Sequence, residues 1–148
     1  PGALRVLSID PGVGLLFVLF FALGFLLFSS IYAAVGAAVS SEQEAQSLQF
    51  AVLVPLFLPL IFLTSIAGDP RGTLATVLGQ IPLTAPIAMP MRLAAAPIPP
   101  LEVLTSLVLL VAGLAAVSWI AGKIYRIGIL STGKKPTLAE VMRWIRTA

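Results

Sequence analysis

The sequence predicts an all-α integral membrane protein with three transmembrane helices, a re-entrant helical pair and a C-terminal amphipathic helix. Of its 148 residues, 59% are hydrophobic and 10% are charged, and the mean hydropathy is +1.06. Soluble domains carry about 25% charged residues, so this chain has too little polar surface for a water-soluble globule. Three long apolar runs alternate with shorter polar or proline-rich segments. We therefore interpret residues 1–148 as a single transmembrane domain fragment.

The first span is expected at about residues 13–39. No charge occurs between Asp10 and Glu42, a run longer than the roughly 20 residues that cross a bilayer, so we expect tilt or an interfacial end. Small residues three or four positions apart in its second half predict a stripe for close helix packing. General alanine and glycine richness is the alternative. The stripe consists of Ser29, Ala33, Gly36, Ala37 and Ser40.

A polar connector, residues 40–47, leads to a second span at about residues 48–67. This span contains Pro55 and Pro59, and each proline removes a backbone hydrogen bond. A membrane helix tolerates that loss where neighbouring groups satisfy the freed carbonyls. We expect a kinked or partly unwound helix that faces other helices, either as a flexible transport element or as a static kink.

The next stretch is uncharged from residue 73 to residue 91, yet prolines interrupt it every four residues. A proline inside a helix costs about 3 kcal/mol, which argues against one continuous span. We expect a re-entrant element at 73–95, made of two short helices at about 73–80 and 86–95. The candidate gating or re-entrant residues are Pro55, Pro59, Pro82, Pro86, Pro90 and Arg92.

The third span is expected at about residues 101–127, with Glu102 in its first turn, where a carboxylate suits the helix dipole. A second small-residue stripe runs along it, again with general composition as the alternative. Aromatic and basic residues at its far end are typical of a headgroup layer. The stripe is Ala112, Ala115, Ser118 and Gly122, and the expected interface anchors are Trp119, Lys123, Tyr125 and Arg126.

The tail, residues 128–148, is expected to hold one more helix from Leu138 to about Arg146. Thr137 and Glu140 match a capping box, and apolar residues recur on one helical face. Trp144 is expected to be a further anchor at the membrane surface. This pattern indicates an interfacial or partner-docking helix and not a fourth span.

Basic residues set the predicted orientation. Six of the nine lie at or after the end of the third span, so the positive-inside rule places the C-terminus in the cytoplasm of a plasma (bacterial inner) membrane. With three spans, the connector is then cytoplasmic and the re-entrant element lies outside. Because the chain starts at Pro1 and not at Met, we also expect further spans upstream.

The residues for enzymatic chemistry are missing. The chain has no Cys and no His, which removes thiolate nucleophiles, histidine acid–base catalysis and Cys/His metal sites. Asp10 and Asp69 fall at span ends. The segment Gly128–Lys134 matches part of a phosphate loop, but Lys135 stands where a Ser or Thr is required. We expect no catalytic, cofactor or metal site and no nucleic-acid partner.

Three segments, in order, resemble the C-terminal half of a type-2 ABC export permease, near the sodium-extrusion and multidrug branch. The first is Val35-Gly-Ala-Ala-Val-Ser-Ser-Glu-Gln-Glu-Ala-Gln, after a small-residue span. The second is Pro82-Leu-Thr-Ala-Pro-Ile-Ala-Met-Pro-Met-Arg92. The third is Lys123-Ile-Tyr-Arg-Ile-Gly-Ile-Leu with Gly133-Lys-Lys-Pro and the amphipathic tail.

The resemblance implies that the three spans are the fourth, fifth and sixth of a six-span permease. Such permeases are dimers with two cytoplasmic ATP-binding subunits, and ATP binding switches them between inward- and outward-open states. This chain would then be a transport subunit and no enzyme, with ATP hydrolysis on a separate subunit. The family's main coupling helix precedes span four, so no coupling residue transfers to this chain. The substrate stays open.

Two hypotheses remain at this point. The first is an exporter permease subunit that forms the pathway with a second permease subunit, homologous or identical. The alternative is a non-transporting membrane scaffold or assembly protein. In the first, the connector residues Glu42, Gln43 and Glu44 are a possible contact with the ATPase subunit, while a plain solvated turn is the competing interpretation.

Overall fold

The computed structural model describes residues 10–130 and 138–147, and these residues form seven helices and no strand. The predicted all-helical class is thereby confirmed. Three helices are long and apolar enough to cross a membrane. These are α1 (Pro11–Ala38), α2 (Glu42–Ile61) and α6 (Pro100–Leu130), and the shorter ones are α3 (Leu63–Gly68), α4 (Thr73–Gln80), α5 (Ala85–Ala95) and α7 (Leu138–Arg146).

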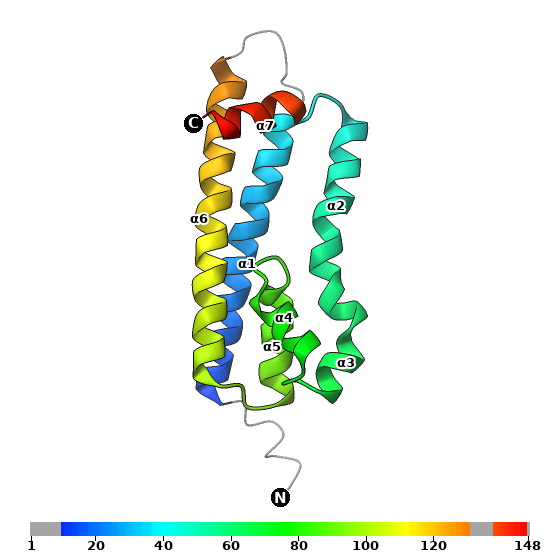
Figure 1. The fold of residues 1–148 in the computed structure, drawn as a ribbon, viewed down its shortest axis with the longest axis vertical. Helices are drawn as coiled ribbons and strands as arrows, with labels where there is room; N and C mark the ends of the chain where they lie inside the picture. Colours follow the sequence, from blue (N-terminus) through cyan, green and yellow to red (C-terminus); the bar gives the residue numbers. More distant parts are fainter. Residues whose placement is uncertain (1–9, 131–137, 148) are drawn as a thin grey trace, which may run out of the picture.

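Helices α1 and α6 lie side by side along most of their length (Figure 1). Their apolar side chains meet α5 in the main core, which includes Phe20 and Leu27 of α1, Met89 of α5 and Leu110 of α6. The hydroxyl oxygens of Ser30 and Ser118 lie 3.2 Å apart across the α1–α6 contact. The long helices therefore carry the fold, and α5 fills the space between them.

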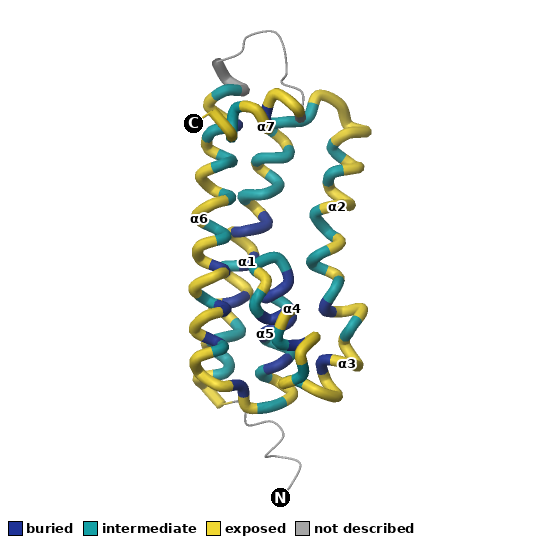
Figure 2. The backbone as a smooth tube through the Cα atoms, in the orientation of Figure 1, coloured by how far each residue is buried: buried dark blue, intermediate teal, exposed yellow. Residues whose placement is uncertain are grey.

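Helix α2 stands apart from the other long helices, and its residues are mostly exposed or half-buried (Figures 1 and 2). It begins at Glu42 and includes most of the segment expected as a connector. Ser41 explains the early start, because its hydroxyl oxygen accepts the Glu44 backbone N–H at 3.2 Å. The helix continues through Pro55 and Pro59 and ends at Ile61, and only Phe62 separates it from α3.

Helices α3, α4 and α5 form a compact block at the end of the bundle where α6 begins (Figure 1). A second, smaller core holds them together through Ile66 of α3, Ala75 and Leu78 of α4 and Ala88 of α5. At 1.5 Å per residue, α4 and α5 are roughly 12 and 16 Å long, about half the thickness of a bilayer core. Neither helix crosses a membrane by itself.

The predicted small-residue stripes are largely exposed, so they do not pack helices of this chain against each other. Ser29, Ala33 and Gly36 are exposed on α1, and a Cβ added at Gly36 would meet nothing within 4 Å. Ala112, Ala115 and Gly122 of α6 are exposed as well. Ser118 belongs to its stripe and does approach α1 through Ser30. The close helix approaches occur at other glycines.

Some predicted features lie outside the described residues. These are the Thr137 member of the capping box, the basic residues Lys134 and Lys135, and most of the segment that partly matches a phosphate loop. Glu140 itself lies in the first turn of α7.

Candidate functional site

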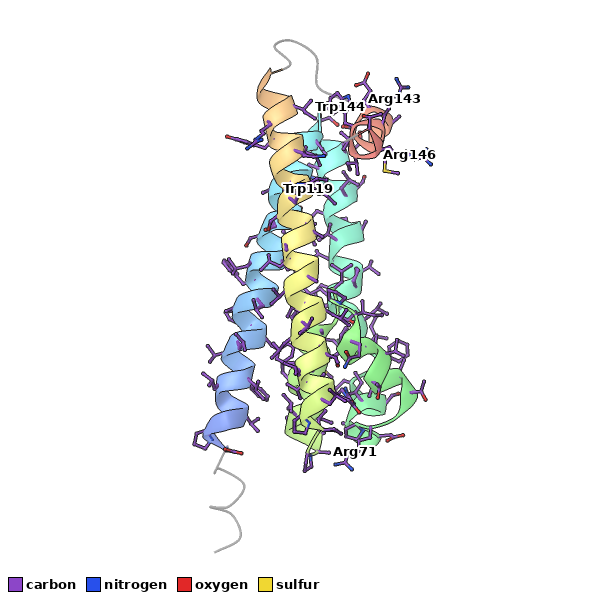
Figure 3. The ribbon with its side chains drawn as sticks, turned by 60° about the vertical axis from the view of Figure 1, so that its left-hand side comes forward. Arg71, Trp119, Arg143, Trp144 and Arg146 are labelled. Atoms are coloured by element: carbon purple, nitrogen blue, oxygen red, sulfur yellow. The ribbon has the colours of Figure 1, made fainter. Side chains whose placement is uncertain are left out.

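The segment from α4 to α5 is a hairpin whose two ends are joined at one place. The Arg71 guanidinium, just before α4, donates two hydrogen bonds to the Pro97 carbonyl oxygen, just after α5, at 3.1 and 2.6 Å. From within α5, Arg92 Nε donates to the Pro70 carbonyl oxygen at 2.7 Å. The chain therefore enters and leaves the hairpin at the same end of the bundle, where Figure 3 shows Arg71.

Arg92 of α5 is the centre of a polar cluster between the hairpin and α6. Its side chain is fully buried, and one guanidinium nitrogen pairs with the Glu102 carboxylate of α6 at 2.6 Å. The same nitrogen lies 3.3 Å from the Thr76 hydroxyl of α4. Arg92 was predicted only as a gating or re-entrant residue, and the fold encloses it completely. A buried charge needs such a full set of partners, because an unpaired one is very costly.

Further hydrogen bonds attach α4 to α6 along the hairpin. The Gln80 amide nitrogen donates to the Glu102 carbonyl oxygen at 2.9 Å, and the Thr105 hydroxyl donates to the Gln80 side-chain oxygen at 3.1 Å. The buried Ser106 hydroxyl donates to the Gly79 carbonyl oxygen at 2.5 Å. Thr84, at the tip, donates to the Leu78 carbonyl oxygen at 2.5 Å. The hairpin and the first turns of α6 are thus one hydrogen-bonded unit.

The prolines at the hairpin tip lie against glycines of the long helices. A Cβ added at Gly24 of α1 would lie 2.5 Å from the Cβ of Pro86, and one at Gly113 of α6 would lie 3.0 Å from the Cβ of Pro82. Pro90 lies inside α5 without ending it. Pro86 is therefore seated where only a glycine leaves room, and Pro82 packs so closely that a side chain at Gly113 would require a small shift. Neither glycine was predicted from the sequence to be a contact site, although isolated glycines in otherwise apolar spans are a signal for close helix approach.

An apolar pocket of about 390 Å³ lies beside the tip, between α1, α2 and α5. Pro86 and Ile87 of the hairpin, Leu56 of α2 and aromatic residues of α1 line it. Pro59 of α2 is buried and Pro55 is half-buried, so both prolines lie on the side of α2 that faces the rest of the bundle. The aromatic residues are Phe21, Phe25, Phe28 and Tyr32.

The predicted partner contact lies at the opposite end of the bundle, at the start of α2 (Figure 1). Glu42, Gln43 and Glu44 are all exposed there. The Glu44 carboxylate accepts the Ser40 backbone N–H at 3.0 Å, which gives it a local structural role. Glu42 and Gln43 lie in the same first turn. The structure keeps these three residues together and far from the hairpin.

The predicted anchors also gather at that end (Figure 3). The Lys123 ammonium lies 3.9 Å from the centre of the Trp119 ring, a cation–π contact one turn apart on α6. Tyr125 and Arg126 are exposed beside them, and Trp144 of α7 is half-buried. In the described residues, no three His, Cys, Asp or Glu side chains gather as metal ligands.

The family model of the ABC-2 family transporter proteins matches residues 3–123, and the match ends within α6. This chain belongs to the ABC-2 transporter family. It is therefore a multi-pass membrane protein of a transporter class, and the resemblance to type-2 ABC permeases is confirmed at the level of the family. The matched region includes α1 to α5 and leaves α7 outside.

The ABC-2 chain is also 25% identical over 128 residues to the Uncharacterized protein MJ1024 of Methanocaldococcus jannaschii. The alignment covers 86% of this chain but 32% of that protein, so the chain spans about a third of its relative's length. No solved structure matches the chain.

Proposed function

We propose that this chain is part of a permease subunit of an ATP-driven ABC exporter. In this proposal it forms the translocation pathway with a second permease subunit, and ATP is hydrolysed on separate ATP-binding subunits. The family match over residues 3–123 is the observation that carries it. The relative's greater length is consistent with further spans in the full protein. The sodium-extrusion and multidrug branch remains part of the proposal.

The hairpin supports a transport function over a passive membrane scaffold. A scaffold needs spans that pack, but it does not need two half-length helices turned back into the bundle. Irregular backbone at membrane depth is tolerated where it is buried in protein or lines a cavity. Here the tip residue Pro86 touches Gly24 and also borders the apolar pocket. We propose that α4 and α5 are a re-entrant element at the pathway's outer end.

The orientation in this proposal follows the basic residues. Lys123, Arg126, Arg143 and Arg146 lie at the end opposite the hairpin, and the positive-inside rule favours a cytoplasmic location for that end. Residues Asp69 to Arg71 and the hairpin's joined ends would then face outside. The start of α2 would face the cytoplasm, within reach of an ATP-binding subunit.

At the start of α2, Glu44 is bound at the helix cap, whereas Glu42 and Gln43 are the residues best suited to contact that subunit. Glu44 is engaged with Ser40, so its substitution mainly disturbs the helix end and does not test the interface cleanly. Single exposed ion pairs contribute about 0–1 kcal/mol, which makes single neutralisations weak tests. The sharper variant is Glu42→Lys with Gln43→Lys, which adds positive charge and keeps the cap.

The test uses the full-length protein, purified with its ATP-binding subunits and reconstituted in vesicles. We expect ATP hydrolysis to co-purify with the protein, and the Glu42→Lys/Gln43→Lys variant to lose coupling between hydrolysis and export. Glu44→Gln is the control for the cap, and we expect it to change helix-end stability with little effect on coupling. Export that stays fully coupled in the double variant removes the proposed contact. Absence of any co-purifying ATPase would favour the scaffold alternative.

A further inference from the structure

Helix α7 runs crosswise to the spans at the basic end of the bundle. It is seen lengthwise in Figure 1 and end-on in Figure 3, so its axis is roughly perpendicular to the long helices. An element in this direction at a bundle end lies along a membrane surface and does not cross it. The family match ends at residue 123, so α7 lies outside the matched region.

The two faces of α7 differ in chemistry. Val141 is buried, and Trp144 and Ile145 are half-buried, so the apolar face is seated on the protein. Arg143 and Arg146 are exposed and three residues apart, which places them next to each other on the opposite face. Figure 3 shows both arginines directed away from the bundle. Their position in the last turn also suits the helix dipole, but that does not require two exposed guanidinium groups.

The neighbouring end of α6 marks the depth of a headgroup layer. Trp119 is exposed and holds the Lys123 ammonium over its ring, and Tyr125 and Arg126 are exposed a turn further on. Aromatic side chains of this kind settle where acyl chains meet headgroups. After Glu102 the sequence has six basic residues and a single carboxylate, Glu140. In the described part of α7 and the end of α6, four basic residues face this single carboxylate, whereas Glu42 and Glu44 at the same end belong to α2. The surface formed by α7 and the end of α6 is therefore complementary to an anionic lipid surface.

We propose that α7 and the end of α6 bind anionic phospholipid, with Arg143 and Arg146 contacting the headgroup phosphates. A guanidinium group matches a phosphate by two parallel hydrogen bonds, which an ammonium cannot form. Each basic residue near an anionic membrane surface contributes roughly a fivefold factor in affinity. The proposal needs only the membrane location of the chain and does not depend on the transport function.

The experiment measures lipid binding to the full-length protein by native mass spectrometry. Phosphatidylglycerol and phosphatidylcholine are titrated separately into the purified protein in detergent. We expect tighter binding of phosphatidylglycerol, and a loss of roughly tenfold or more in Arg143→Gln/Arg146→Gln. The difference should shrink as ionic strength rises. Arg143→Lys/Arg146→Lys keeps the charge, so we expect partial retention. Gln46→Ala, at an exposed uncharged position of α2, should leave binding unchanged.

Several outcomes would overturn the proposal. Equal binding of the two lipids, or full phosphatidylglycerol binding by the Gln double variant, removes the site. Displacement of the lipid by millimolar inorganic phosphate indicates a site for a free anion. Loss of the ATP-binding subunit with unchanged lipid binding in the double variant indicates a protein docking surface. Both arginines are exposed, so we expect the double variant to keep the melting temperature of the wild type. An unchanged melting temperature excludes misfolding as the cause of lost lipid binding.

Discussion

The carboxylate of Glu102 lies 2.6 Å from the guanidinium of Arg92, which joins α6 to the last turns of α5. The two residues are unequal, because the arginine side chain is fully buried whereas the glutamate side chain is 34% exposed. Loss of the carboxylate would leave a buried positive charge with neutral acceptors only. Loss of the arginine would leave a carboxylate that water can reach.

This asymmetry predicts that Glu102→Leu destabilises the protein more than Arg92→Met. Breaking a buried ion pair costs about 3–5 kcal/mol, and we expect about 2–3 kcal/mol for Glu102→Leu because water screens part of this pair. The double variant should lose less than the sum of the single losses. Thermal unfolding in detergent measures this, with exposed Glu42→Leu as the control. Equal effects of both single variants would contradict the assigned burial.

Gly24 and Gly36 of α1 predict opposite effects of the same substitution. In Gly24→Ala the new Cβ would lie 2.5 Å from the Cβ of Pro86, so α1 and α5 must separate, at a cost of about 1–3 kcal/mol. Gly36→Ala meets nothing within 4 Å and should stabilise the helix by roughly 0.5–1 kcal/mol. Melting temperatures of the two variants should therefore shift in opposite directions. A similar rise for both would contradict the contact between Gly24 and Pro86.

The cap of α2 predicts a local effect of Ser41→Ala. The Ser41 hydroxyl oxygen accepts the Glu44 N–H, and loss of such a cap costs about 1 kcal/mol. We expect faster amide hydrogen exchange in the first turn of α2, with little change from Leu56 onward. Ser29→Ala, at an exposed position on α1, is the matched control. Unchanged exchange in the Ser41 variant would mean that the cap does not set the start of α2.

The proposed orientation predicts which single cysteines react from outside an intact cell. The chain has no native Cys, so introduced thiols report cleanly for this part of the protein. Asp69→Cys, in the exposed turn between α3 and α4, should react with a membrane-impermeant maleimide. Glu42→Cys, at the start of α2, should react only after the membrane is permeabilised. The reverse pattern would invert the orientation and with it the proposed location of the ATPase contact.

Local sequence signals were sufficient for much of the helical architecture. A helix that crosses a bilayer satisfies its own backbone hydrogen bonds, so hydropathy and proline spacing define the elements without knowledge of their neighbours. The expected bounds of α4 at 73–80 agree with those in the structure. The start of α2 was placed too late, although Ser41-Glu42-Gln43-Glu44 itself has the Ser-x-x-Glu form of a capping box.

The sequence by itself determined the membrane class, the three apolar spans and the proline-broken segment, because these depend on composition and on near neighbours in the chain. Only the tertiary structure decided that Arg92 is enclosed and paired with Glu102, and that Gly24 and Gly113 receive the hairpin prolines. Those contacts join residues far apart in sequence, and hydropathy contains no information about which apolar surfaces meet. In a bilayer the hydrophobic effect does not select between helix faces, so steric fit and buried polar partners make that choice.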